Sequence, residues 1–167
     1  GYGGGLYYTE DRFANVKPFL DADGREIYPK DIISCICLSD YNEMYLGLEE
    51  QGVAKLDLVT GTVTRLQLSD NPAAPLFVRH ILPYSPDELW IGTESGIVVY
   101  NIRTRRYQHL KSSPYDPYSL SDNAVYSLCK DREGGLWIGS FFGGINYLPQ
   151  RNSDFEKYYH TDDPHSL

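Results

Sequence analysis

One short phrase recurs three times along the chain: an apolar residue, an aromatic residue, an aliphatic residue and a glycine. The three copies are Met44-Tyr45-Leu46-Gly47, Leu89-Trp90-Ile91-Gly92 and Leu136-Trp137-Ile138-Gly139. Their glycines are 45 and 47 residues apart. A period of about 45 residues is typical of a four-stranded β-propeller blade. Because one blade cannot cover its own apolar face, the repeat predicts sheets that stack on one another.

Each repeat contains four segments with the character of β-strands. The innermost strand is predicted at 32–38, 77–82 and 124–130, and the second, which carries the phrase, at 43–47, 88–92 and 135–140. The third is predicted at 53–58, 97–102 and 145–148, and the polar fourth at 62–67, 106–110 and 155–159. We therefore predict an all-β fold with almost no helix. The architecture is a partial β-propeller of about three four-stranded antiparallel blades, with partial blades at the termini.

The repeat also predicts how the chain divides. Residues 1–31 are expected to hold the outer two strands of a partial blade, since Gly4-Gly5-Leu6 matches Gly143-Gly144-Ile145. The blades are predicted at 32–75, 76–122 and 123–160, and a connector to a further blade at 161–167. Closed propellers need about four to eight blades. We therefore expect a fragment of a ring, whose open faces pair with the rest of the propeller or with another copy of the chain.

The aromatic residue of the phrase, Tyr45, Trp90 or Trp137, is expected to fill the space between neighbouring blades, because its large apolar area suits packing between sheets. The regular period favours this structural role over stacking on sugars. The glycine that ends the phrase is expected where a side chain would crowd the adjacent blade or where the backbone must turn.

The charge balance of the chain restricts its partners. The net charge is −8 and the sequence pI is about 4.9. Nucleic acid is not expected as a partner, because phosphate binding needs clustered positive charge. The one basic cluster, Arg103, Arg105 and Arg106, is interpreted as a solvated edge strand that resists aggregation. No apolar run of about 18 residues occurs, so no membrane contact is expected in this segment.

No cysteine, metal or catalytic site is expected. Cys35 and Cys37 lie two residues apart on one strand face, and Cys129 is the repeat equivalent of Cys37, so the sequence predicts three free, buried thiols. No ligand spacing for a metal is present, and no cofactor is predicted. No Ser/His/Asp set or phosphate-binding glycine loop occurs, so we predict that this segment is not an enzyme.

Candidate binding residues lie on the face that carries the longer loops. Phe141 and Phe142 place two adjacent aromatic rings in a turn whose equivalents are acidic or polar. They either offer a ring for a sugar or a partner domain, or fill the gap to the next blade. Tyr115 and Tyr118 are weaker candidates from a neighbouring loop. His80 is expected to be a structural, hydrogen-bonded histidine.

The third repeat carries a longer pattern. It reads Ser121-Asp122-Asn123-Ala124-Val125-Tyr126-Ser127-Leu128, then Asp131-Arg132-Glu133-Gly134-Gly135-Leu136-Trp137-Ile138-Gly139, then Gly143-Gly144-Ile145-Asn146-Tyr147. This pattern resembles the two-component regulator propeller repeat, which builds the periplasmic sensor region of hybrid two-component systems in Bacteroides-type bacteria. The resemblance is looser in the first repeat, where Tyr45 replaces the usual tryptophan.

The resemblance implies a parent protein and a place in the cell. The parent would be an inner-membrane hybrid histidine kinase with a DNA-binding output, and this segment would lie in the periplasm. The stimulus would be a glycan, an oligosaccharide ligand of the propeller, and the signal would pass through a rearrangement of domains or of a dimer. The alternative is an interaction scaffold that binds no small molecule in this segment.

Overall fold

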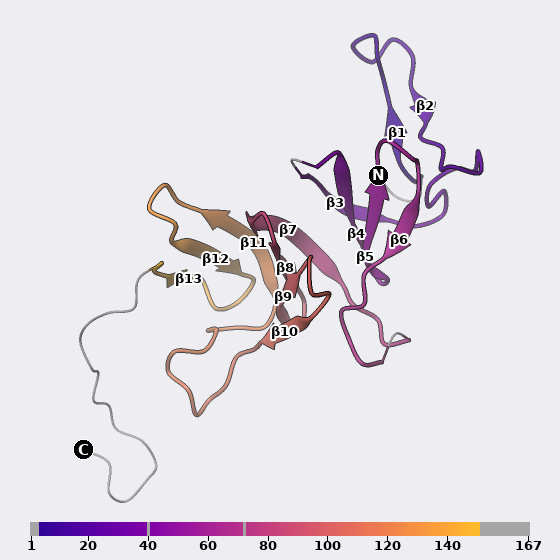
Figure 1. The fold of residues 1–167 in the computed structure, drawn as a ribbon. Helices are drawn as coiled ribbons and strands as arrows, with labels where there is room; N and C mark the ends of the chain where they lie inside the picture. Colours follow the sequence, from indigo (N-terminus) through magenta and orange to yellow (C-terminus); the bar gives the residue numbers. More distant parts are fainter. Residues whose placement is uncertain (1–3, 40, 72, 151–167) are drawn as a thin grey trace, which may run out of the picture.

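The computed structural model describes residues 4–39, 41–71 and 73–150. All the regular elements in these ranges are β-strands, as predicted, and no helix occurs in them. None of the described residues forms a helix that could cross a bilayer. The strands form three larger antiparallel sheets and one two-stranded sheet (Figure 1).

The first two of the larger sheets have four strands each, paired in chain order. The first contains β3 (Ile33–Leu38), β4 (Glu43–Leu48), β5 (Gly52–Asp57) and β6 (Val63–Arg65). The second contains β7 (Val78–Ser85), β8 (Glu88–Thr93), β9 (Gly96–Asn101) and β10 (Tyr107–Leu110). This meander agrees with four strands per repeat, and we refer to the sheets as the first and second blades.

The third blade has three described strands, β11 (Val125–Lys130), β12 (Leu136–Ser140) and β13 (Ile145–Leu148). The fourth strand predicted at 155–159 and the connector predicted at 161–167 lie outside the described residues. The two-stranded sheet is formed by β1 (Tyr7–Tyr8) and β2 (Lys17–Pro18). Next to it, Leu6 and Ile27 are buried against the outer face of the first blade.

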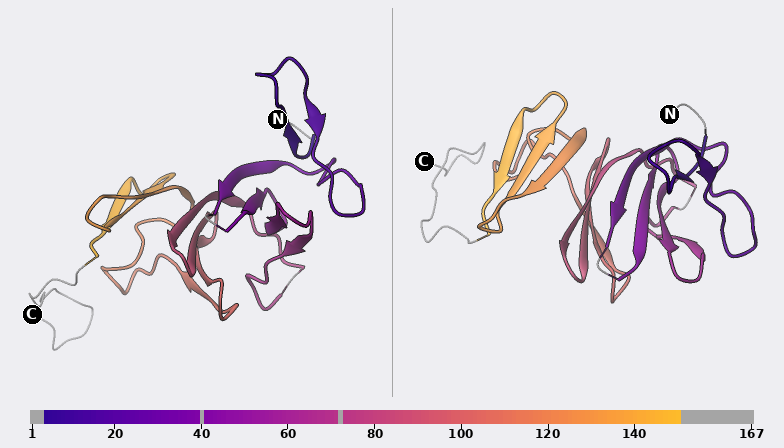
Figure 2. Two further views of the ribbon diagram at one scale, coloured as in Figure 1. Left: turned by 45° about the horizontal axis from the view of Figure 1, so that its top comes forward. Right: turned by 90° about the horizontal axis from the view of Figure 1, so that it is seen from above.

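The blades stand side by side in chain order, with their innermost strands β3, β7 and β11 adjacent (Figures 1 and 2). Alternation along each central strand sends neighbouring side chains to opposite sheet faces. In β8, Leu89 and Ile91 therefore pack in a cluster with the first blade, whereas Trp90 packs in a cluster with the third. Each central strand of the first two blades is thus buried on both faces.

The aromatic residues of the phrase differ in burial. Tyr45 is fully buried between the first and second blades, and Trp90 is 7% exposed between the second and third. Both fill the space between blades, as predicted. Trp137 is 45% exposed and so departs from the prediction. The physical reason is that no described sheet lies against that face of the third blade.

The phrase glycines lie where blades approach closely. A Cβ at Gly92 would meet Val125 Cγ1 at 3.0 Å and the Val125 carbonyl oxygen at 3.1 Å, on the next blade. A Cβ at Gly47 would meet Cys35 Sγ on its own blade and Val78 Cγ1 at 2.8 Å on the next. Crowding, rather than a backbone turn, therefore accounts for glycine at these two positions.

All three cysteines are free, as predicted, but they are less buried than predicted. Cys35 and Cys37 are half-buried beside the cluster between the first and second blades. Cys129 is exposed, because it pairs with Trp137 on the uncovered face of the third blade. Burial at this repeat position depends on the next sheet and not on the strand itself.

Candidate functional site: a rim shared by three blades

The innermost strand of every described blade contains a β-bulge at the same repeat position. The pairing register with the second strand shifts across Ser34, Arg79 and Tyr126. A bulge inserts one unpaired residue and changes the direction in which its side chain points. The three bulges lie at the strand end near the turns that connect the second and third strands. This edge of the molecule therefore receives Arg79 and Tyr126, whereas Ser34 Oγ donates to the carbonyls of Gly47 and Val78 between the first two blades.

At the second blade the redirected residue is a charged one. The guanidinium of Arg79 donates from Nε to Glu94 Oε1 at 3.0 Å, and a second nitrogen also contacts that oxygen. Its third nitrogen lies 3.8 Å from Glu49 Oε1 on the first blade. The Arg79 hydrogen bond lowers the pKa of Glu94, and that of Arg79 is raised by the same contact. Arg79 thus links the equivalent turns of two blades.

At the third blade the redirected residue is aromatic, and like Arg79 it contacts a glutamate in a turn of the preceding blade. Tyr126 Oη donates to Glu94 Oε1 of the preceding blade at 3.2 Å. Its ring lies 5.3 Å from that of Phe141 on its own blade, and the Arg79 guanidinium lies 5.2 Å from the Tyr126 ring centroid. We call Glu49, Arg79, Glu94, Tyr126, Phe141 and Phe142 the rim cluster.

Phe141 and Phe142 form the outer end of the rim cluster. Phe141 is 62% exposed and Phe142 is 84% exposed, and their rings contact edge to face with centroids 4.6 Å apart. Neither side chain is buried by the described residues, so adjacent positions do not place one ring inside the fold here. A cluster of exposed rings beside a paired arginine and glutamate offers both stacking faces and hydrogen-bonding groups.

The turn that carries these rings is held by the connector before β11. Asp122 Oδ2 accepts a hydrogen bond from Phe142 N at 3.0 Å, and Ser121 Oγ donates to the Gly143 carbonyl at 2.9 Å. The bond from Phe142 N is the main cause of a lowered pKa at Asp122. The side chains of Ser121 and Asp122 thus hold the aromatic turn in place through hydrogen bonds to its backbone.

Tyr115 and Tyr118 lie in the loop between β10 and β11 and are 85% and 62% exposed. The aromatic contacts of the rim cluster, Tyr126 with Phe141 and Phe141 with Phe142, include neither of them. The structure therefore brings Phe141 and Phe142 together with Tyr126 and does not add these two tyrosines to that aromatic group.

Sequence reasoning missed Arg79, Glu94 and Tyr126 as members of one site. The signal that could have found them is the repeat spacing. Ser34, Arg79 and Tyr126 stand 13 residues before the phrase glycines, and Glu49, Glu94 and Phe141 stand two residues after them. At each of these two repeat positions the residue type differs from blade to blade. Such variation at equivalent positions is typical of a binding surface that several blades of a rigid scaffold form together.

His80 is hydrogen-bonded, as expected for a structural histidine. Its Nδ1 accepts a hydrogen bond from Leu128 N on the third blade at 3.2 Å, so the bond needs the neutral ring with its proton on Nε2. The repeat equivalents of His80 are Cys35 and Ser127. The residue joins two blades and takes no part in the rim cluster contacts described above.

The His80 bond makes stability depend on pH. Burial lowers the pKa of His80 below its ordinary value of 6.5, so the unfolded chain takes up the proton first as the pH falls. The contribution of His80 should be fully present above about pH 6.5 and be lost progressively below it. Urea unfolding at pH 7.5 and 5.5 should therefore show a smaller loss on acidification in His80→Ser than in the original chain. Equal losses in the two proteins would contradict this role.

Comparison with known proteins places the repeat in a family. Residues 119–142 match the family model described as "Two component regulator propeller". The chain is 37% identical over 70 residues to Histidine kinase P4 of Formosa agariphila, a stretch that covers 41% of this chain and 5% of that protein.

Solved structures show the same fold. The extracellular domain of the putative hybrid two component system BT4673 from B. thetaiotaomicron superposes with a TM-score of 0.63 at 21% identity, over 74% of this chain and 16% of that one. The corresponding domain of BT3049 gives 0.55 at 18% identity, over 99% and 27% of the two chains. The present chain thus spans only a small part of each relative. It is a propeller segment whose third repeat matches the two-component regulator propeller model.

Proposed function

We propose that this segment is part of an extracytoplasmic sensor propeller of a hybrid two-component histidine kinase and that its rim cluster recognises a glycan. The observation that carries the proposal is the rim itself, where the bulges of the second and third blades bring Arg79 and Tyr126 beside the turn residue Phe141. The regulator repeat at 119–142 supports the assignment to a sensor. Aromatic faces and a charged pair are the groups that recognise the apolar face and the hydroxyls of a sugar ring.

The proposed location and output follow from the same family. The segment would lie in the periplasm, as part of a protein anchored in the inner membrane. A rigid β body moves as a unit, so binding would act by favouring one arrangement of domains or of a dimer over another. The rim is suited to this coupling, because Glu49, Arg79 and Tyr126 join three consecutive blades into one contact network.

The proposal predicts saturable glycan binding that depends on the two exposed rings. A glycan array followed by calorimetry on the best ligand should give binding that is weakened at least tenfold, roughly 1.4 kcal/mol, in the variant with Phe141→Ala and Phe142→Ala. Phe13→Ala is the matched control, since Phe13 is 81% exposed on a turn near the N-terminus. Equal weakening by the control, or no loss in the double variant, would contradict the rim as the site.

A second candidate function is an interaction scaffold, and the third blade favours it. On this blade Trp137, Ile145 and Tyr147 are 45%, 73% and 45% exposed, although their equivalents Trp90 and Ile97 are buried under the next blade. We propose that this apolar face is covered by the rest of the propeller or by another copy of the chain. Absence of any glycan binding together with retained self-association in sedimentation would favour the scaffold over the sensor.

A further inference from the structure

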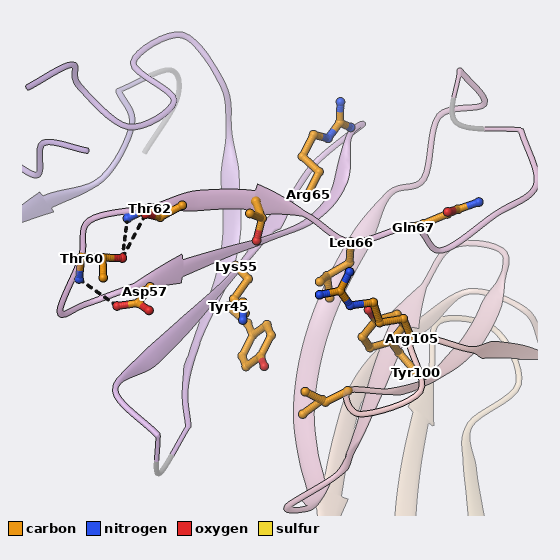
Figure 3. Close-up of a pocket in the computed structure, with 12 residues that line it drawn as sticks. Tyr45, Lys55, Asp57, Thr60, Thr62, Arg65, Leu66, Gln67, Tyr100 and Arg105 are labelled. Carbon is orange, nitrogen blue, oxygen red and sulfur yellow. Dashed lines mark hydrogen bonds between the residues drawn. The ribbon is translucent and has the colours of Figure 1, made fainter. Parts of the chain in front are cut away.

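We propose that the groove between the outer parts of the first and second blades binds a small hydroxylated organic anion, such as a sugar acid, through Lys55 and Arg105. The groove has a volume of about 600 Å³, which is in the range of small-molecule sites. It is lined by residues of both blades (Figure 3), and its lining includes no residue of the rim cluster. The inference therefore does not depend on the proposed glycan role of the rim.

The two walls of the groove carry matched groups. Tyr45 and Lys55 project from the first blade, and Tyr100 and Arg105 project from the second, with Leu66 on the chain between them (Figure 3). Burial raises the pKa of Tyr100, and the charges of Arg105 and Lys55 oppose that rise. Both cations are therefore close enough to act on the same phenol group, from opposite walls of the groove.

The charge of the groove differs from that of the whole chain. The lining includes three cations, Lys55, Arg65 and Arg105, in a protein whose net charge is −8. Lys55 Nζ pairs with Glu43 Oε1 at 2.7 Å, and the Arg65 guanidinium donates to the Gln51 carbonyl and points away from Lys55 and Arg105 (Figure 3), so the positive charge that the groove offers a ligand comes mainly from Arg105. Arg105 forms no ion pair with an acidic side chain among the described residues. An anionic oxygen group would complete its pairing.

Arg105 also occupies a backbone position that costs stability. Its φ is +57°, in the left-handed region, and its N–H donates to the Asn101 carbonyl at 2.8 Å. The equivalent residue of the first blade is Gly61, with φ +71° and the same bond to Asp57. Glycine adopts this conformation without strain, whereas a long side chain does not. The second blade has an arginine where the first blade has a glycine, although the backbone favours glycine. Because the arginine side chain lies in the groove, we infer that this side chain serves binding.

Lys55 is a second position where the first two blades differ and where the groove gains a cation. It pairs with Tyr45 in the register, and the residue that pairs with Trp90 in the second blade is Val99. A valine at this position packs in the cluster between the second and third blades, so apolar packing does not require a lysine there. The remaining wall supplies hydroxyl and amide groups for a hydroxylated ligand, from Thr60, Thr62, Thr64 and Gln67.

The test titrates the chain with glucuronate at constant ionic strength, followed by calorimetry, with glucose and inorganic sulfate as comparison ligands. Glucuronate should bind saturably, glucose should not bind, and sulfate should bind at least tenfold more weakly. Arg105→Gly should weaken glucuronate at least tenfold while leaving the melting temperature within a few degrees, since glycine suits that backbone. Lys55→Val should weaken it similarly.

The matched control is Arg103→Gln, which removes the same charge two residues away, where Arg103 pairs with Asp87 at 2.8 Å. It should leave glucuronate affinity unchanged, as should Phe13→Ala at the exposed turn near the N-terminus. Failure of Phe142→Ala to affect glycan binding would count against the rim alone. Absence of glucuronate binding, glucose or sulfate affinity equal to that of glucuronate, or an equal loss in Arg103→Gln would overturn the groove assignment.

Discussion

Replacing Trp90 with alanine should lower the free energy of unfolding by roughly 3 to 5 kcal/mol, the usual cost of deleting a large buried aromatic side chain. Trp90 is 7% exposed in the cluster between the second and third blades, and its indole N–H donates to Glu88 Oε1 at 2.5 Å. Truncation would leave a cavity between two sheets and an unpartnered carboxylate. Urea unfolding followed by circular dichroism measures the loss.

Trp137→Ala is the matched control, because Trp137 occupies the same repeat position in the third blade. Its side chain is 45% exposed, although it still contacts Tyr147 with ring centroids 4.6 Å apart. The expected loss is roughly 1 kcal/mol, as for a partly exposed side chain. Losses of equal size in the two variants, measured at low protein concentration, would contradict the difference in burial between the two faces.

The substitution Gly96→Ala should be about as damaging, through the backbone rather than through the core. Gly96 begins β9 with φ +107°, and a Cβ there would clash with the Leu110 carbonyl oxygen on β10. Backbone strain of about 1 to 3 kcal/mol adds to about 1 to 3 kcal/mol for forced displacement, so a total of roughly 2 to 6 kcal/mol is expected. The melting temperature and urea midpoint should both fall.

Gly52 provides the control for this variant, since it holds the equivalent position in the first blade. Its φ is +75°, but the nearest atom to a built Cβ is Leu76 Cδ2 at 3.7 Å, an ordinary contact. Gly52→Ala should therefore cost only about 1 kcal/mol, from the left-handed backbone. If Gly52→Ala proved as destabilising as Gly96→Ala, the steric part of the argument would be wrong.

The strands could be predicted from the sequence because each repeat contains the same short phrase, which ends in a glycine. The recurring phrase places the second strand of each repeat, and alternation then assigns side chains to faces. The prediction failed at Trp137 and Cys129, where burial depends on a neighbouring sheet. Local sequence determines which face a residue points to, but only the next blade determines whether that face is covered.

The members of the rim cluster were harder to predict. A bulge adds one residue to a strand, so the buried residues on either side of it, Val78 and Ile81 or Val125 and Leu128, stand three apart and the two-residue alternation is broken. One such break in a short strand does not reveal where the side chain of Arg79 or Tyr126 points. Phe141 and Phe142 were accessible to sequence reasoning because two aromatic residues are unexpected in a turn. Arg105 was interpreted from the sequence as part of a solvated edge strand. Its left-handed backbone, which it shares with the equivalent residue Gly61, is known only from the structure.

The repeated bulge has a consequence for how such chains diversify. Ser34, Arg79 and Tyr126 lie outside the buried clusters that hold the blades together, so a change at one of them need not repack those clusters. Duplication of a repeat would therefore add one new side chain at this bulge position while the buried clusters keep their packing. Selection could then change the binding preference of the surface through single residues, one repeat at a time, while the packing of the sheets is preserved.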